Sequence, residues 1–577
     1  MTKACKVALE ADFRYNNLIG KDFFSCRSSH SKKEEPHSLT SSEKDTLILG
    51  MQDEIHALQR NYEQLLEQFR VFEQQRFGRH TEKLDQITGQ MNLFDETEFL
   101  YDPSIPEPSE EEILPAVTRK RRPRGKREED LKGIKQEDIP AHDVSREDLD
   151  RYFGPGNWRY FGDDTFKRLR YIPSEKVVEN HVVRVYVGTD GDHQDEFLRG
   201  DHPAEPMENS ISTPSLIGAV LNGKYVLGLP YERIAGRFQE DGINVSKQDL
   251  ANWVMNVYKN YFRPFCARLK TELFTCHVNQ SDETPVQVLH YAGEKTDPSV
   301  ERSKSYMWVH RSGEFYRDRP IILYEYNKSR GSEVPLAYYE GYQGVIESDA
   351  LQQYHILADK SPGITSANCW AHARRDFSDA VKAIGKTNED AIKQSVAYKA
   401  LTFIAAIYHV EGTLKNLTAE ERHQQRQEHV KPLVDAFFKW VKQEVTLNAA
   451  LPKGKTSKGL NYCLNQEKYL RVFLDDGEVP IDNSAAERAI RPFTIGRKNW
   501  LFFNTERGAE AGAGVYSIAE TAKANHLNTF WYFNHLLTVL PELKRKYGSV
   551  DLAPVNELDR CLPWSKDLPE ECHSKRH

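Results

Sequence analysis

The stretch VPIDNSAAERAIRPFTIGRKNWLFF, residues 479–503, decides how the rest of the chain is interpreted. Pro480 and the Asp-Asn-Ser triplet after it predict a helix start, because such residues cap helix N-termini. Glu487 stands four residues before Arg491, so both side chains project from one helical face. A surface ion-pair helix is the plain alternative, but the density of cations favours a functional cluster. These cations are Arg488, Arg491, Arg497 and Lys498.

An acid held among cations suits metal-assisted phosphoryl transfer. The metal ion needs hard oxygen ligands, and a phosphodiester needs its charge neutralised. One carboxylate cannot hold two metal ions, so further acids must come from elsewhere in the chain.

Composition limits the class of protein. A chain of 577 residues is too long for one core and predicts about three to five domains. With 78 basic and 86 acidic side chains the net charge is −8, so local clusters must indicate any nucleic-acid binding. The 8 cysteines contain no C-x-x-C pair, which argues for a reducing compartment and against a cysteine-based zinc site. Without a bilayer-length apolar run or a signal-peptide core, we expect a soluble intracellular protein.

The N-terminal third divides into four segments. Residues 1–44 are polar and predict a flexible N-terminus. Residues 45–78 carry apolar side chains at spacings of three and four, which favours a self-associating coiled coil over an isolated amphipathic helix. Residues 79–133 form a linker whose basic run, 119–127, is either a solvated tail or a phosphate contact. Residues 134–200 alternate as short strands do and predict a small β-rich module.

Residues 201–262 predict a helix-turn-helix. One helix ends before Gly242, and Ser246 caps the next. In a DNA-reading version the second helix enters the major groove, whereas a plain helical hairpin has the same outline. The side chains expected to contact DNA are Ser246, Lys247, Gln248 and Asn252.

Residues 263–375 predict the first part of an RNase H-like core. Three strands, a short helix, a strand ending in an acid and a late helix with another acid follow one another in the order of that fold. The strand acids then lie side by side, and the late helix brings in the third acid. Strands are predicted near 277–288, 306–310, 320–326 and 344–349.

Asp282, Asp349 and Glu487 are therefore the predicted catalytic and metal-binding acids. They would hold two divalent cations roughly 4 Å apart, one activating the attacking hydroxyl and one stabilising the leaving oxygen. Each acid alone could be an ordinary cap or turn residue. Two neighbouring acids, Glu283 and Asp482, could be mistaken for members of this set. In a strand, Glu283 would point to the opposite side from Asp282.

A second cationic element, NCWAHARRDF at 368–377, enters a helix between the second and third acids. We expect His372, Arg374 and Arg375 to bind phosphate or a DNA strand. The alternative is that the arginines are solvated and that Cys369 and its tryptophan neighbour are core.

The remaining segments complete a multidomain α/β protein. Residues 376–478 show helical periodicity and predict a helical insertion. Residues 479–505 return to the core with the third acid, and residues 506–577 predict a C-terminal helical region.

Three long motifs resemble the large transposase of the insertion-sequence family numbered sixty-six. They are SDETPVQV at 281–288, CWAHARR at 369–375, and the DN, AERAIRP and GRKNWLF blocks within 482–502. The segment RFGRHTEKL at 76–84 is similar too, and the likeness runs from the coiled coil to about Leu540.

The resemblance implies a DDE transposase, an RNase H-like enzyme that cleaves and transfers DNA strands at the ends of a mobile element. It implies two divalent ions, Mg²⁺ or Mn²⁺, at the three acids, and carboxylate ligands alone do not distinguish these ions. The implied partners are terminal-repeat and target DNA and small accessory proteins of the same element, besides the second copy expected from the coiled coil. A bacterial, cytoplasmic and nucleoid-associated location is implied as well.

Members of that family carry a cysteine-ligated zinc module where this chain has residues 134–200. No cysteine occurs there, so we predict no zinc site and a metal-free β fold. Two other functions stay open: a catalytically inactive or domesticated DNA-binding relative, and a structure-specific nuclease on the same fold. The intact acids argue against the first, and the separate DNA-binding segments argue against the second.

Overall fold

The computed structural model describes most of the chain from residue 210 onward and scattered residues before it. The chain divides into two compact units, 1–66 and 67–577, and each is described by itself. The predicted flexible segment 1–44 and the linker 79–133 lie outside the described residues. None of the described helices combines the length and apolar character that crossing a bilayer needs. The described residues are 210–291, 305–384, 389–447 and 454–574, with parts of 48–72, 145–159 and 176–208.

The described positions between residues 48 and 72 are helical, as predicted. The apolar seam side chains are all exposed. Pairing of this helix with a second copy stays a prediction. The seam residues are Ile48, Met51, Ile55, Leu58, Tyr62, Leu65, Phe69 and Phe72.

The described part of residues 134–200 contains one helix and one two-stranded antiparallel sheet. These are α6 (Arg146–Phe153), β1 (Val185–Val187) and β2 (Phe197–Arg199). The strand predicted over 176–187 is therefore a strand only in its last three residues. Both faces of β1 are exposed, so no packing extends the pairing further.

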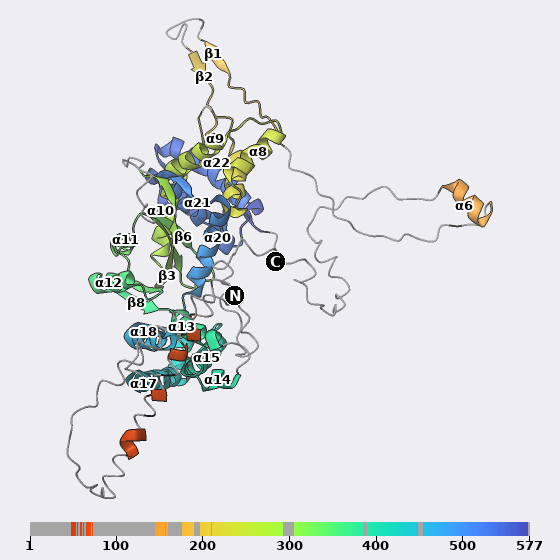
Figure 1. Cartoon of the computed structure of the whole chain (residues 1–577). Helices are drawn as coiled ribbons and strands as arrows, with labels where there is room; N and C mark the ends of the chain where they lie inside the picture. The colour runs from red at the N-terminus through yellow and green to blue at the C-terminus, as the bar shows by residue number, and fades with distance from the viewer. Residues whose placement is uncertain are drawn as a thin grey trace, which may run out of the picture. The chain divides into compact units, whose positions relative to one another are not determined.

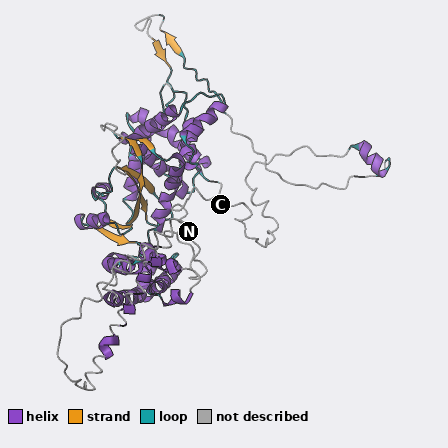
Figure 2. Cartoon of the chain, in the orientation of Figure 1, coloured by secondary structure: helices purple, strands orange, loops and turns teal. Residues whose placement is uncertain are grey.

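A mixed five-stranded sheet lies beside the helices of the C-terminal half (Figures 1 and 2). Its spatial order is β6-β5-β3-β7-β8, with β5 antiparallel to both β3 and β6, and β7 parallel to both β3 and β8. Four of these strands confirm the predicted ones, and β8 was not predicted. The strands are β3 (Val278–Val286), β5 (Ser305–Ser312), β6 (Ile322–Asn327), β7 (Gly344–Ser348) and β8 (Ile364–Asn368).

Helix side chains cover the edge of this sheet. Ser517 and Thr521 of α21 (Glu506–Ala524) accept hydrogen bonds from the backbone N–H groups of Tyr324 and Ile322, at 2.7 and 3.0 Å. An uncovered edge strand would offer these groups to another chain, so α21 closes the sheet on the β6 side. A short parallel pair, β4 (Val288–His290) and β9 (Phe503–Thr505), joins the end of the first strand segment to the start of α21.

The helices before and after the sheet share one hydrophobic cluster, which runs from Ile217 to Cys572. The predicted helix-turn-helix and the predicted C-terminal helical region therefore pack on each other. Ser246 caps the second helix of the pair through a capping box with Asp249, as its position predicted. The helices are α7 (Pro214–Leu221), α8 (Tyr231–Glu240), α9 (Lys247–Val257), α10 (Arg263–Leu273), α22 (Thr529–Tyr547) and α23 (Val555–Asp559), with π-helical turns at Asn222–Val226 and Tyr258–Phe262.

Three further helices belong to this part of the fold, and two of them connect strands of the sheet. α11 (Glu333–Tyr338) confirms the predicted short helix, and α12 (Gln352–Lys360) joins β7 to β8. α20 (Ser484–Trp500) is the helix predicted from the opening motif. At its far end Asn499 Nδ2 donates to the Gly228 carbonyl at 3.2 Å, and Lys224 Nζ lies 5.3 Å from the Trp500 ring.

The described chain between β8 and α20 is mainly helical, as predicted for 376–478, and forms a second hydrophobic cluster. Its centre contains a charge: the Arg426 side chain is fully buried and pairs with Glu411. The helices are α13 (Trp370–Ile384), α14 (Glu389–Gln394), α15 (Val396–Leu414), α16 (Ala419–Gln425), α17 (Lys431–Leu447), α18 (Lys455–Leu470) and α19 (Val472–Asp475), with a π-helical turn at Arg426–Val430.

Candidate active site

The sheet register brings the first two predicted acids to one place. Gln280 of β3 pairs with Glu347 of the parallel neighbour β7. Two residues further along the same register, Asp282 in the middle of β3 stands next to Asp349, which directly follows the carboxyl end of β7. Parallel strands thus place two carboxylates side by side from segments that lie far apart in the sequence.

The third acid is brought in by hydrogen bonds between the start of α20 and β3. Asn483 Nδ2 donates to the Ser281 carbonyl at 2.7 Å, and Gln280 Nε2 donates to the Asp482 carbonyl at 3.2 Å. Both bonds are buried, so they fix the helix start against the strand that carries the first acid. Glu487 follows one turn into the helix.

The acids repel one another. The pKa of Asp282 lies well above its usual range, first because the carboxyl is buried and then because Glu283, Asp349 and Glu487 are close. Burial also raises the pKa of Asp349, while Arg330 opposes that rise. Buried carboxylates that raise one another's pKa are the arrangement that a bound cation stabilises.

The donor set fits a hard divalent cation. Asp349 Oδ1 is buried, and no hydrogen-bond partner reaches it among the residues that the structure describes. Carboxylate oxygens are the ligands that Mg²⁺ and Mn²⁺ prefer. Asp282 and Asp349 therefore have the ligand chemistry, and Asp349 the unsatisfied oxygen, that a metal-binding role requires. Among the described residues, the group whose ligand atoms all lie within 4.8 Å of one another is a different one, Cys369, His372 and Glu487.

The two neighbouring acids that could be mistaken for members of the set, Glu283 and Asp482, have other partners. Glu283 accepts from Arg330 at 2.6 and 2.8 Å, and burial together with Asp349 raises its pKa to about 7. The Tyr408 hydroxyl donates to Asp482 at 2.9 Å, and the second carboxylate oxygen of this acid accepts from the backbone N–H of Ser484. Asp482 thus caps α20.

The cations of α20 differ in exposure. Lys498 is exposed, Arg491 is partly buried, and Arg488 is exposed and pairs with Glu314 at 2.9 Å. Arg497 Nη1 donates to the Thr284 hydroxyl at 3.2 Å, which ties the last turns of the helix to β3. Arg497 therefore braces the helix in this structure.

The α13 cations are also unequal. Arg375 is half-exposed and lies 4.0 Å from Glu487, whereas burial lowers the pKa of Arg374, which is more enclosed. Burial and then Arg375 lower the pKa of His372 to about 3. His372 is therefore neutral at physiological pH and can offer a phosphate only a hydrogen bond.

The predicted DNA-contacting residues of α9 lie on one exposed surface. Lys247 pairs with Glu232 at 2.7 Å, and Gln248 Nε2 donates to Asn252 at 3.4 Å. The Ser246 hydroxyl donates to its capping partner at 2.7 Å. Exposed, weakly held side chains of this kind can exchange their present partners for a ligand.

Sequence reasoning missed one residue beside the acids. Cys369 is fully buried at the start of α13, and its Sγ accepts the backbone N–H of Asn483 at 3.1 Å. Cys369, His372 and Glu487 each offer a ligand atom within 4.8 Å of the others. The C-x-x-H spacing at 369–372 is the signal that could have identified it.

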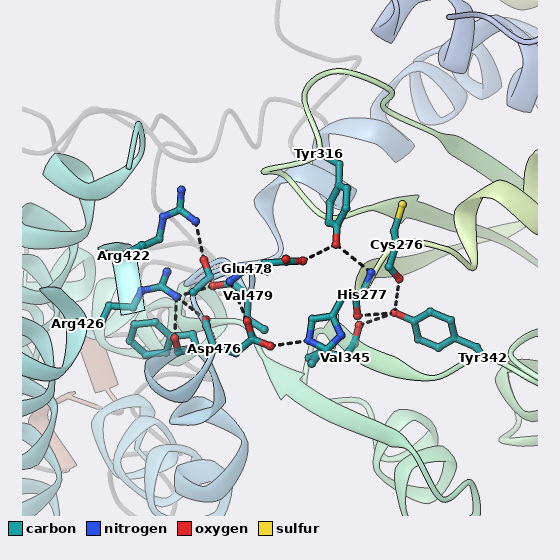
Figure 3. A network of polar contacts seen from close by, with 12 residues as sticks. Cys276, His277, Tyr316, Tyr342, Val345, Arg422, Arg426, Asp476, Glu478 and Val479 are labelled. Carbon is teal, nitrogen blue, oxygen red and sulfur yellow. Dashed lines mark hydrogen bonds and ion pairs between the residues drawn. The ribbon is translucent and has the colours of Figure 1, made fainter. Parts of the chain in front are cut away.

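A polar network supports the segment that leads into α20 (Figure 3). Arg426 Nη1 donates to the carbonyls of Phe473, Asp476 and Val479 at 2.7, 2.9 and 2.9 Å. His277, next to β3, contacts the Asp476 carboxylate at 2.7 Å. The helical insertion thus holds the approach to the helix that carries the third acid.

Comparisons with known proteins find two family models and several relatives. A family model described as Transposase IS66 family matches residues 209–511, which is more than half of the chain and contains all three acids, and one described as Transposase C of IS166 homeodomain matches residues 64–141. Uncharacterized protein y4qI of Sinorhizobium fredii is 26% identical over 422 residues, 70% of this chain and 71% of that protein. Uncharacterized protein y4jD of the same organism is 25% identical over 451 residues, 75% and 81% of the two chains.

Proposed function

Because the chain belongs to the IS66 family of transposases, we propose that it is a DDE transposase that cleaves and transfers DNA strands at the ends of an insertion sequence. The observation that carries the proposal is the adjacency of Asp282 and Asp349, with Glu487 close enough to raise the pKa of Asp282. The strand order β6-β5-β3-β7-β8 also supports an RNase H-like core, because it makes β3, which carries Asp282, the neighbour of β7, which ends just before Asp349.

In this proposal Asp282, Asp349 and Glu487 hold divalent metal ions, Mg²⁺ or Mn²⁺. When bound, such ions activate an attacking hydroxyl and stabilise the leaving oxygen of an in-line displacement. Water is the first nucleophile and the freed 3′ hydroxyl the second, so no covalent enzyme intermediate forms. The buried carboxylates restrict water around the reacting phosphodiester, which strengthens every electrostatic contact there.

The remaining residues position DNA. Arg375 and Arg488 are exposed around Glu487 and neutralise phosphates. The surface of α9 that carries Lys247, Gln248 and Asn252 contacts the terminal repeats, and pairing through the N-terminal helix brings two element ends together.

The test is strand cleavage of DNA that carries the ends of the chain's own element, with Mg²⁺, comparing the wild type with Asp282→Asn, Asp349→Asn and Glu487→Gln. These isosteric amides remove charge and little volume. We expect each to bind DNA and to cleave at least about 10²-fold more slowly. Asp482→Asn is the matched control, because its role is to cap a helix.

A wild type that binds the ends but cuts nothing, even with accessory proteins of the element, would favour the DNA-binding relative. An amide variant that cuts at the wild-type rate would show that its acid was wrongly assigned.

A further inference from the structure

We propose that Cys369, His372 and Glu487 form a binding site for one borderline transition-metal ion such as Zn²⁺, which shares Glu487 with the proposed hard-cation site of the acids. One ligand atom from each of the three residues lies within 4.8 Å of the other two. The residues come from two segments, since Cys369 directly precedes α13, His372 lies in its first turn, and Glu487 lies in α20.

The donor types select the metal. Zn²⁺ binds thiolate, imidazole and carboxylate with similar ease and forms sites with three protein ligands and one open position. Mg²⁺ takes oxygen ligands and avoids sulfur. A sulfur–nitrogen–oxygen set therefore favours a different ion from the one that Asp282 and Asp349 favour.

Cys369 offers its sulfur from a fixed position. Its side chain is fully buried, and its Sγ accepts the backbone N–H of Asn483 at 3.1 Å. Burial and then the nearby carboxylates raise the pKa of this thiol well above its usual range, so the sulfur holds its proton until an ion binds. The indole of Trp370 donates to the Leu470 carbonyl at 2.7 Å, which fixes the start of α13 and hence the place of the sulfur.

His372 lies in the first turn of α13, three residues after Cys369. Its Nε2 is 3.7 Å from Glu487 Oε1, while its Nδ1 is buried and has no hydrogen-bond partner in the described part of the chain. The Nε2 atom is therefore the ring nitrogen that can bind an ion beside Glu487, and no acceptor among the described residues holds a proton on Nδ1.

Occupation of the site has a chemical consequence. Binding converts the Cys369 thiol to a thiolate, and the released proton goes to solvent. The ion also takes an oxygen of Glu487, the acid shared with the proposed catalytic set, so Zn²⁺ inhibits strand cleavage. The inhibition rests on the proposed function, whereas the binding does not.

The test is titration of the full-length protein with Co²⁺, a spectroscopic substitute for Zn²⁺, without Mg²⁺. We expect a thiolate-to-cobalt charge-transfer absorption that saturates at one Co²⁺ per chain and disappears when Zn²⁺ is added. Cys369→Ser should abolish the absorption. Cys463→Ser is the matched control, because Cys463 is equally buried but lies in α18.

Absence of the absorption in the wild type, or its persistence in Cys369→Ser, overturns the proposal. His372→Gln covers the case in which the cysteine variant does not fold: it keeps the sulfur and should weaken Co²⁺ binding by at least ~10-fold. An affinity equal to that of the wild type overturns the proposal as well.

A cleavage assay adds an independent arm. We expect micromolar Zn²⁺ to inhibit the wild type in Mg²⁺, and the half-inhibiting concentration to rise ~10-fold or more in His372→Gln relative to that variant's own rate. If the protein cleaves no DNA at all, the proposed function fails while the Co²⁺ titration still decides the metal site.

Discussion

Replacing Arg426 with methionine should loosen the segment that leads into the catalytic helix. Arg426 is fully buried, and its guanidinium makes two 2.9 Å bonds to Glu411 besides its bonds to three backbone carbonyls. Methionine fills most of the volume but leaves the Glu411 carboxylate buried without its partner. Breaking a buried ion pair in this way costs about 3–5 kcal/mol.

The assay is amide hydrogen exchange, read by mass spectrometry on peptides that cover α18, α19 and the segment 476–483. A loss of this size from the opening free energy accelerates exchange by roughly 10²- to 10³-fold where protection now comes from local structure. Cleavage should slow in parallel, because this segment holds the N-terminus of α20.

Arg422→Met is the matched control. Arg422 is also buried in the insertion and donates to the carbonyls of Leu414, Leu417 and Gly477, but among the described residues no acidic side chain forms an ion pair with it. Its replacement leaves three carbonyls without their donor but breaks no buried ion pair. It should therefore lower the free energy of unfolding by about 1–3 kcal/mol. The double variant Arg426→Met with Glu411→Leu should recover much of the Arg426→Met loss. Equal effects of the two single variants, or no recovery in the double variant, would refute the reasoning.

Two further predictions concern DNA binding and acid stability. Lys247→Ala should weaken binding to the element ends and lower the salt dependence of log Kd by about one phosphate contact; an unchanged salt slope in a filter-binding titration would speak against contact by α9. Burial lowers the pKa of His310, whose Nδ1 lies 2.9 Å from the Ser281 hydroxyl. In the unfolded chain the His310 imidazole has a pKa of about 6.5, so below that pH the unfolded chain binds more protons than the folded one. The stability gained by burying the neutral ring is therefore complete above about pH 6.5 and is lost as the pH falls. The stability gap between wild type and His310→Gln in urea unfolding should therefore shrink from pH 8 to pH 5, and a constant gap would contradict the assignment.

The sheet and the positions of its acids could be predicted because their signals are local. Strand patterns around Asp282 and Asp349 are flanked by turns, and the cap before Glu487 is encoded in three consecutive residues. The strand β8 was missed because its sequence, ITSAN, is short and mostly polar. Its side chains are buried by the insertion, and that packing is a tertiary effect without a local pattern.

The other features that the sequence did not reveal also depend on tertiary packing. The hydrophobic cluster that α7 and α22 share joins residues more than 300 positions apart, and the sequence of α22 does not indicate which helix it packs against. The proposed site at Cys369 did not emerge from a search for paired cysteines, because its companions are a histidine three residues later and a glutamate from another helix. Sequence spacing reveals ligands on one element more readily than ligands that a fold assembles.

The helix α20 has a mechanical consequence. Glu487 stands near its first turn, and about 20 Å away along the axis Trp500 and Asn499 contact the segment just before α8. The helix is continuous between these two ends, with Pro492 inside it. Where it moves as one body, a tilt of about 3° at the Trp500 end moves the carboxylate by about 1 Å. A displacement of that size can change a reaction rate by about 10²-fold. In the proposed function, contact of α8 and α9 with DNA would therefore affect whether Glu487 stands where the chemistry needs it.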